Sequence, residues 1–147
     1  DLSRLVYGEV LPFETVAYEQ GLTLNSQLEE AIFVNGNSLQ LKQLVSILID
    51  NALRHNEGGS EIMVLLKKER GHGILSVINS GKSIPEEQKS QLFERFYRAD
   101  SARTDEGGHY GLGLAIAKNI AAAHKGTIQV RCYDGKVEFF VKIPLKK

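Results

Sequence analysis

The chain has 147 residues, the size of one ordinary domain, and is long enough to bury roughly 70% of the surface that its unfolded form would expose. Its 18 basic and 18 acidic side chains cancel, so net charge indicates neither a nucleic-acid footprint nor a polybasic membrane patch. The sequence contains no long apolar run that would cross a bilayer, and its single cysteine, Cys132, cannot form an internal disulfide, which fits a reducing compartment.

The first predicted element is a helix over residues 1–13. Leucine and valine recur there at helical spacing, and Pro12 is expected to stop the pattern because proline lacks a backbone N–H. The sequence begins without Met and within this helical pattern, so we expect it to be a piece of a longer protein.

Two strands and a second helix are predicted next. Residues 22–28 alternate between apolar and polar side chains and indicate a strand, and residues 31–34 are expected to form another strand before an Asn-Gly turn. Asn37 or Ser38 can then cap a helix that ends near His55. Its apolar face comprises Leu41, Leu44, Val45, Leu48 and Ala52.

The middle of the chain predicts a pair of strands, 61–68 and 73–79, joined by a turn. Pro85 and the two glutamates after it start a short helix, because proline fits a first helical turn and acidic side chains favour its positive end. Residues 99–109 are small and polar and show no periodicity, which indicates a mobile loop. A helix over about residues 112–124 follows.

The C-terminal segment gives the clearest hairpin signal. Apolar side chains alternate from Ile128 to Cys132 and again from Val137 to Ile143, with Asp134-Gly135 as the turn between them. Cys132 falls on the apolar phase of this pattern, which favours a core position. The order of strands, helices and closing hairpin predicts a two-layer α/β sandwich, a mixed sheet covered on one face by about three helices.

One polar cluster stands at the end of the second predicted helix. Asn51, Arg54 and His55 have the spacing i, i+3 and i+4 and share one face, which we expect to lie away from Leu44, Leu48 and Ala52. Asparagine offers a neutral oxygen to magnesium, and arginine and histidine can hydrogen-bond phosphate oxygens. The alternative is a helix C-terminus whose basic residues only complement the helix dipole.

Two glycine-containing stretches add to this cluster. In "EGGHYGLGL", glycines precede a helix whose first backbone amides can approach a phosphate, although the stretch can also be only a loop and has no Walker lysine. In "VINSGKSIP", Asn79 ends a strand and Gly81 follows, an arrangement in which a polar side chain can bind a base edge and glycine leaves room for a flat ring. A simple Asn-Ser-Gly turn is the alternative.

These stretches, in order, resemble a known family. "DNALRH", "NSGKSIP", "LFERFYRAD" and "GLGLAIAKNI" are similar to the N, G1, F and G2 boxes of the ATP-binding catalytic domain of bacterial sensor histidine kinases, which belongs to the Bergerat-fold ATPase and kinase superfamily. The resemblance extends over about residues 26–144. It implies the Bergerat fold, ATP and Mg²⁺ as cofactors, and an ATP lid over residues 98–110.

The resemblance also implies roles for particular residues. Asn51 matches the magnesium-binding asparagine, and Phe93 and Phe96 match the F box at the base of the lid. The residues expected to contact the nucleotide are Asn51, Arg54, His55, Asn79, Gly81, Ile84, Phe96, Arg98, Tyr110, Gly111, Leu112, Gly113 and Leu114. No catalytic residue beyond these ATP-positioning groups is expected within the chain.

The chain departs from the family pattern at three positions. Asn79 stands where the family has an aspartate that accepts a hydrogen bond from adenine, Ser83 replaces a glycine, and His109 replaces another. Aspartate only accepts, whereas an asparagine amide can flip and donate, so we expect ATP to be preferred with weaker discrimination against GTP. His109 is expected to be a solvated lid residue or, alternatively, an added phosphate contact. His72 and His124 are expected to be structural or exposed.

The residue type at position 47 distinguishes kinases from hydrolases in this superfamily, and here it is Ile47. The gyrase-like ATPases carry a glutamate there as the base that activates water, and isoleucine cannot take a proton, so efficient hydrolysis is not expected. The resemblance implies instead that the γ-phosphate passes to a histidine on a separate helical-hairpin domain, and then to a response-regulator aspartate. That histidine is not expected within these residues.

The remaining expectations concern context. The whole chain, 1–147, is taken as a single catalytic domain, with residues 1–20 as the connection from an upstream dimerisation and phosphoacceptor domain. The resemblance implies a domain that is monomeric by itself, contacts no nucleic acid or membrane directly, and lies on the cytoplasmic side of a membrane-anchored parent. The alternative function is a non-catalytic module of the same fold that senses nucleotide or binds a partner.

Overall fold

The computed structural model describes residues 1–89, 91–94, 97–98, 109–111 and 113–146. Its helices are α1 (Leu2–Glu19), α2 (Ser38–His55), α3 (Glu86–Lys89) and α4 (Gly113–Ala123), with a 3₁₀ turn, η1 (Gln91–Phe93). Its longer strands are β1 (Thr23–Leu28), β2 (Glu61–Glu69), β3 (His72–Ser80), β6 (Thr127–Tyr133) and β7 (Lys136–Pro144). Two short strands, β4 (Tyr97–Arg98) and β5 (His109–Gly111), pair with each other.

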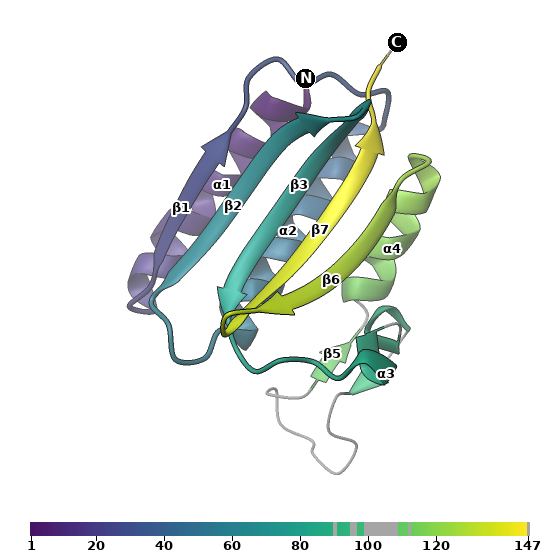
Figure 1. Cartoon of the computed structure of the whole chain (residues 1–147). Helices are drawn as coiled ribbons and strands as arrows, with labels where there is room; N and C mark the ends of the chain where they lie inside the picture. The colour runs from purple at the N-terminus through teal and green to yellow at the C-terminus, as the bar shows by residue number, and fades with distance from the viewer. Residues whose placement is uncertain (90, 95–96, 99–108, 112, 147) are drawn as a thin grey trace.

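The five longer strands form one mixed sheet in the order β1-β2-β3-β7-β6. The β1–β2 pair is parallel and the other neighbouring pairs are antiparallel. Helices α1, α2 and α4 lie together behind the sheet, while its other face is turned to the viewer (Figure 1). This arrangement confirms the predicted two-layer sandwich with a mixed sheet and three covering helices.

The core lies between the sheet and these helices. Alternate side chains of the central strands, such as Val64, Val77 and Val141, point to the helices and are buried, as are Leu48 and Ile49 of α2. Because strand side chains alternate in direction, the same strands place their other residues on the uncovered face. No helix within the described part of the chain combines the length and apolar character needed to cross a membrane.

Helix α2 begins where the sequence predicts. The side chain of Asn37 accepts a hydrogen bond from the backbone N–H of Gln40 at 2.9 Å, which caps the helix. The backbone N–H of Asn37 in turn donates to Nε2 of His124, which lies beyond the end of α4, so the cap is joined to a second helix. The His124 ring is buried and its Nδ1 donates to the Ile120 carbonyl, which confirms a structural role for this histidine.

Both predicted hairpins are present. The β6–β7 turn places Asp134 and Gly135 at positive φ values of 49° and 72°, the conformation that makes Asp-Gly favourable in a two-residue hairpin loop. Arg70 and Gly71 adopt similar angles between β2 and β3. Cys132 is half-buried and packs against the core, as its place in the strand predicts.

The first helix is longer than predicted. Pro12 lies inside α1, which continues to Glu19, so the prediction that Pro12 ends the helix was wrong. Phe13 and Ala17 continue the apolar face beyond the proline, and Ala17 is fully buried. Tertiary packing of this face therefore outweighs the cost of a proline within a helix, which is about 3 kcal/mol.

Residues 31–34 do not form the predicted strand. Ala31 has a positive φ of 60°, which is incompatible with an extended strand. The backbone groups that a strand would use in a sheet bond elsewhere: the Ile32 carbonyl accepts from Leu2 N–H at 2.8 Å, and the Phe33 carbonyl accepts from Lys146 N–H at 2.8 Å. Ile32 is fully buried, so its apolar character reflects a loop that closes the core.

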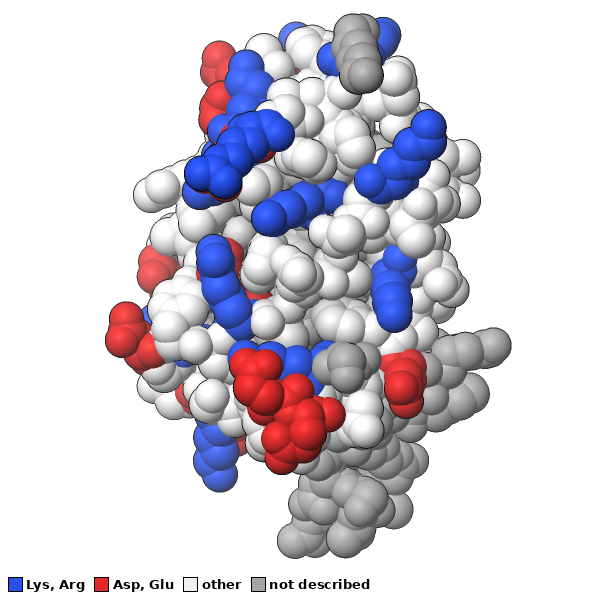
Figure 2. Space-filling model, turned by 45° about the vertical axis from the view of Figure 1, so that its right-hand side comes forward, with Lys and Arg blue, Asp and Glu red and all other residues white. Residues whose placement is uncertain are grey.

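The uncovered face of the sheet is partly polar. Figure 2 shows lysine and arginine side chains lying apart over this side of the molecule, separated by uncharged surface. Glu138 of β7 is only 3% exposed there, because Arg131 and Tyr133 of the neighbouring strand hydrogen-bond to its carboxylate. The Arg131 guanidinium also lies 4.6 Å from the centre of the Phe140 ring.

Candidate functional site

The predicted site residues come from the end of α2, the end of β3 and the start of α4. Asn79 Nδ2 donates to the backbone carbonyl of His55 at 3.3 Å, which joins the ends of β3 and α2. A Cβ placed on Gly113 would lie 3.4 Å from Cγ2 of Ile47, so the first turn of α4 packs against α2 one turn before Asn51. The structure therefore brings three of the four family boxes to one end of the domain.

Asn51 is the most distinctive residue of this cluster. Its side chain is 8% exposed, and its Nδ2 is buried without a hydrogen-bond partner among the described residues. A buried amide nitrogen without a partner costs about 1–3 kcal/mol, so this donor is available to a ligand oxygen. Asparagine also offers Oδ1, an oxygen of the kind that magnesium prefers.

Asn51 does not lie on the face that the sequence predicted. The cluster was expected to point away from Leu44 and Leu48, yet Asn51 is buried beside the core positions of α2. Residues seven apart on a helix share a face, so Asn51 follows Leu44 onto the covered side of α2. The prediction was wrong because it considered only the spacing within the cluster.

Arg54 stands apart from Asn51. Its Nε lies 3.0 Å from Oδ2 of Asp50, and both side chains are more than half exposed. This is an ion pair between residues four apart on a helix surface, an interaction worth about 0.3–0.5 kcal/mol. Such a weak pair leaves the guanidinium available to exchange its partner for a phosphate, but the structure does not itself direct Arg54 to Asn51.

Asn79 is held in one orientation by two backbone carbonyls. Its side chain is 2% exposed, and Nδ2 donates to the carbonyls of His55 at 3.3 Å and Ser80 at 2.9 Å. Carbonyl oxygens only accept, so a flipped amide would lose both bonds and face them with its own oxygen. Oδ1 is therefore the atom through which Asn79 can accept a hydrogen bond from another group.

Three segments meet beside Asn79 through contacts that the sequence analysis missed. Asn56 accepts a hydrogen bond from Ser80 N–H through Oδ1 at 3.0 Å and donates from Nδ2 to the Gly59 carbonyl at 2.7 Å. The backbone N–H of Gly81 donates to the Gly135 carbonyl at 3.0 Å. An asparagine just after a helix and before two glycines was the available signal, because asparagine side chains commonly bond nearby backbone groups.

Gly81 leaves space between these elements. A Cβ at this position would meet Val137 Cγ2 at 3.5 Å, Asn79 Nδ2 at 3.6 Å and the His55 carbonyl oxygen at 3.6 Å. These are ordinary contact distances, so alanine would fit Gly81 while filling the space next to Asn79. The absence of a side chain at position 81 therefore leaves the space next to Asn79 open.

The other predicted contacts differ in accessibility. Leu114 is 1% exposed and belongs to the core, so only its backbone can contribute to a site. Ile84 is half-buried, and its N–H donates to Cys132 Sγ at 3.3 Å. Phe93 packs edge to face on Phe139, with ring centres 6.1 Å apart, and so anchors the F-box segment to the sheet.

The lid region is described only at its two ends. β4 and β5 pair antiparallel, with Tyr97 opposite Gly111 and Arg98 opposite His109, a ladder that the sequence did not predict. Phe96, Leu112 and residues 99–108 lie outside the described residues, as do the side chains of Arg98, His109 and Tyr110. The predicted roles of these residues stay predictions.

Within the described ranges, no group of three histidine, cysteine, aspartate or glutamate side chains is arranged to hold a metal ion. Magnesium is commonly held by one or two protein oxygens together with water and substrate phosphates. A site built on Asn51 and a nucleotide fits that pattern better than a dedicated protein cage.

Comparison with known proteins identifies the family. The model of the histidine kinase-, DNA gyrase B- and HSP90-like ATPases matches residues 36–147. The chain belongs to this family, and its open mixed sheet with covering helices is the Bergerat fold of histidine kinase catalytic domains.

Its curated relatives are sensor kinases. The chain is 38% identical over 145 residues to the sensor protein DltS of Streptococcus agalactiae, covering 99% of the chain and 36% of DltS. It is 35% identical over 145 residues to the probable sensor histidine kinase TcrY of Mycobacterium tuberculosis, covering 99% of the chain and 30% of TcrY. The chain thus spans about a third of the length of these relatives.

Solved structures agree with the fold. The catalytic domain of histidine kinase ThkA superposes with a TM-score of 0.81 at 26% identity, over 96% of this chain and 90% of that one. The mycobacterial sensor histidine kinase MprB gives a TM-score of 0.84 at 24% identity, over 99% and 97% of the two chains.

Proposed function

We propose that this domain binds ATP with Mg²⁺ and donates the γ-phosphate to a histidine on a separate helical-hairpin domain of a sensor histidine kinase. The observation that carries the proposal is the buried amide of Asn51 near the end of α2, whose Nδ2 has no hydrogen-bond partner among the described residues. Asn51 lies one helical turn after Ile47, which packs against Gly113 at the start of α4. Membership of a histidine kinase and ATPase family supports ATP as the nucleotide.

The chain's own contribution is to bind and orient the nucleotide. Asn51 Oδ1 would hold magnesium, Asn51 Nδ2 can donate to a phosphate oxygen, and Arg54 can leave Asp50 for the phosphates. Backbone amides in the first turn of a helix have no partner within that helix, and those of α4, which starts at Gly113, favour anionic groups. Bound magnesium would neutralise charge on the phosphates. Phosphoryl transfer depends chiefly on such positioning, so no covalent residue of this domain is required.

The packing of Ile47 supports a kinase over a hydrolase. Ile47 lies one helical turn before Asn51 and contacts the Gly113 position, so the site is lined there by a methyl group. A methyl group cannot accept a proton from water, and hydrolysis in solution is therefore expected to be slow compared with transfer to histidine.

The proposed partners are the phosphoacceptor hairpin domain and a response regulator. One solved structure similar to this chain, with a TM-score of 0.82, is histidine kinase ThkA in complex with the response regulator TrrA. The relatives named as sensors support a membrane-anchored parent with this domain on its cytoplasmic side. By itself the domain is proposed to be monomeric, to contact neither nucleic acid nor membrane directly, and to follow the upstream domain through residues 1–20.

The test of the proposed function is phosphoryl transfer in trans. The 147-residue chain, radiolabelled ATP and magnesium are incubated with a separately expressed helical-hairpin domain of a related sensor kinase. We expect a label on the hairpin that is stable to alkali and labile to acid, and that is absent when the hairpin histidine is replaced by alanine. Tight ATP binding without any transfer to several hairpins would favour the non-catalytic nucleotide-sensing module instead.

Nucleotide selectivity is expected to depend on Asn79. Wild type should bind ATP more tightly than GTP, because Oδ1 can accept from the adenine amino group whereas guanine presents a carbonyl there. The two hydrogen bonds of Nδ2 oppose a flip, so Asn79→Asp should raise the ratio of GTP to ATP dissociation constants only modestly, by less than about tenfold. Calorimetric titration of both proteins with both nucleotides measures this ratio; equal ratios would contradict the expectation that asparagine relaxes selectivity.

A further inference from the structure

The exposed side of α1 carries an apolar stripe that no part of the described chain covers. Tyr7, Leu11 and Tyr18 are 56%, 43% and 81% exposed, and exposed apolar side chains that adjoin one another mark interaction surfaces more often than scattered single ones do. Their spacing of four and seven residues places them in one line along the helix. Gly8 lies beside this line, and a Cβ added to it would meet nothing within 4 Å, so the surface there is low and open.

Hydrogen bonds on the two flanks of α1 fix the direction of this stripe. On one flank, the Glu9 carboxylate accepts from Ser46 Oγ of α2 at 2.8 Å, so this side of α1 faces the helix layer. On the other flank, Ser3 Oγ donates to the Glu29 carbonyl at 2.6 Å, just after β1. Tyr7 and Leu11 follow Ser3 at intervals of four residues, so the stripe lies toward the flank of α1 that faces β1. β1 is the edge strand of the sheet (Figure 1).

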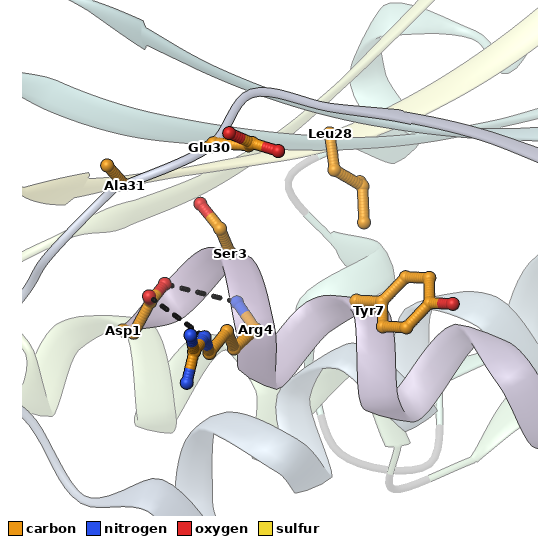
Figure 3. Close-up of a pocket in the computed structure, with 7 residues that line it drawn as sticks. All are labelled: Asp1, Ser3, Arg4, Tyr7, Leu28, Glu30 and Ala31. Atoms are coloured by element: carbon orange, nitrogen blue, oxygen red, sulfur yellow. Dashed lines mark hydrogen bonds and ion pairs between the residues drawn. The ribbon is translucent and has the colours of Figure 1, made fainter.

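A hollow of about 460 Å³ continues the stripe at the N-terminal end of α1. Tyr7 and Arg4 line it from α1, Leu28 lines it from the end of β1, and Glu30 and Ala31 line it from the segment after β1. Leu28 points across the hollow toward Tyr7, and the carboxylate of Glu30 lies at its rim (Figure 3). A lysine or arginine side chain can therefore pack its apolar stem between Tyr7 and Leu28 and place its charged end beside Glu30.

The charges around the stripe are mainly negative. Arg4 is the one basic side chain within α1 (Leu2–Glu19), and its Nε lies 3.8 Å from Asp1 Oδ2, so it already has a carboxylate beside it. Glu14 and Glu30 are exposed and take part in no ion pair among the described residues. A second copy of the same surface would bring like charges together, whereas a basic partner would match them.

We propose that the α1 stripe, formed by Tyr7, Leu11 and Tyr18 together with the hollow at Leu28 and Glu30, docks a basic amphipathic helix of another protein segment. Leucine-like side chains of that helix would pack on Tyr7, Leu11 and Tyr18, over the open position at Gly8. Its lysine or arginine side chains would lie against Glu14 and Glu30. This surface is separate from the nucleotide site at the end of α2.

The test uses a synthetic helix as the probe. A fluorescein-labelled peptide of about 18 residues, roughly five helical turns, carries leucines at spacings of three and four with lysines elsewhere. Its binding to the 147-residue chain is followed by fluorescence anisotropy, against a peptide with glutamate in place of lysine. We expect the basic peptide to bind at least about tenfold more tightly than the acidic one. Equal binding of the two peptides would overturn the proposal.

Variants of the chain distinguish specific binding at the α1 stripe from nonspecific binding of the peptide. Leu11→Ser and Tyr18→Ser should each weaken binding of the basic peptide by about tenfold, and Glu14→Gln with Glu30→Gln should weaken it and reduce its salt dependence. Leu39→Ser is the matched control, because Leu39 is a 76% exposed leucine on α2 away from the stripe. All these positions are exposed, and thermal unfolding checks that the variants fold. An equal loss in Leu39→Ser, or no loss in the stripe variants, would contradict the assignment.

The same variants test whether a second copy of the chain binds to the α1 stripe. Sedimentation of the free chain at increasing concentration should show a monomer. A dimer that Leu11→Ser abolishes would overturn the proposal in favour of self-association through α1.

Discussion

Replacing Asn51 with alanine is expected to weaken magnesium-dependent ATP binding by at least about tenfold, which corresponds to about 1.4 kcal/mol. The substitution removes both the oxygen proposed to hold magnesium and the amide nitrogen proposed to meet a phosphate. Calorimetric titration with ATP, with and without magnesium, measures the change. The difference made by magnesium should disappear in the variant while weak binding of the base remains.

Asn51→Ala has a second readout that distinguishes a binding role from a structural one. Its Nδ2 has no hydrogen-bond partner among the described residues, so alanine should leave the unfolding temperature of the nucleotide-free domain unchanged or raised. Asn25→Ala is the matched control, because Asn25 is an exposed asparagine of β1 that bonds Glu61, away from the proposed site. Unaltered ATP binding in Asn51→Ala would mean that another group holds the magnesium.

The second large effect concerns the buried carboxylate of Glu138. Burial opposes its ionisation, but hydrogen bonds from Arg131, Ser76 and Tyr133 outweigh this and hold the pKa of Glu138 below its ordinary value. Glu138→Ala leaves these three donors without their acceptor, and we expect a loss of about 2 kcal/mol in the free energy of unfolding at neutral pH. Urea denaturation measures it.

The pH dependence of this loss has a definite sign. A carboxylate whose pKa is lowered by folding stabilises the protein above its unfolded pKa of about 4.5, and this contribution is lost as the pH falls through the folded value. The difference between wild type and Glu138→Gln should therefore be largest near neutral pH and shrink below pH 4.5. Glu69→Gln is the control on the same face: its pair with Lys67 spans 3.8 Å between half-exposed side chains, so a change below about 1 kcal/mol is expected. A pH-independent difference for Glu138→Gln would contradict the assigned charge.

Several parts of the fold could be predicted from sequence because local signals agreed with the final packing. Asn37 caps α2, Asp134-Gly135 forms the last turn, and alternating side chains mark β6 and β7. Pro12 and the segment 31–34 were mispredicted because tertiary contacts overrode local preference. The apolar face of α1 continues past the proline, and Ile32 packs as a loop residue with its backbone bonded to α1.

The candidate site could be predicted from the order of the sequence motifs, and less well from the spacing of residues along a helix. The family boxes pointed to Asn51, Asn79 and Gly113, and the structure brings these segments together. The burial of Asn51 was not predictable from the spacing within the cluster, because it depends on which side of α2 faces the sheet and α4. The Arg54–Asp50 pair joins residues four apart on one helix and was therefore available from spacing, but it was not predicted. The bond from Ser80 N–H to Asn56 needed the position of β3, which lies distant in sequence, whereas the bond from Asn56 to Gly59 is local.

The order of strands also bears on when the pocket can form during synthesis. β3 is paired along its whole length with β7, the last strand of the chain, and Asn79 lies opposite Val137. The Gly81 backbone likewise needs the carbonyl of Gly135 as its partner. A nascent chain that has already emerged through α2 and β3 therefore still lacks one wall beside Asn79. The nucleotide binding proposed above would therefore require the β6–β7 hairpin to be in place, because β7 and its turn form this wall.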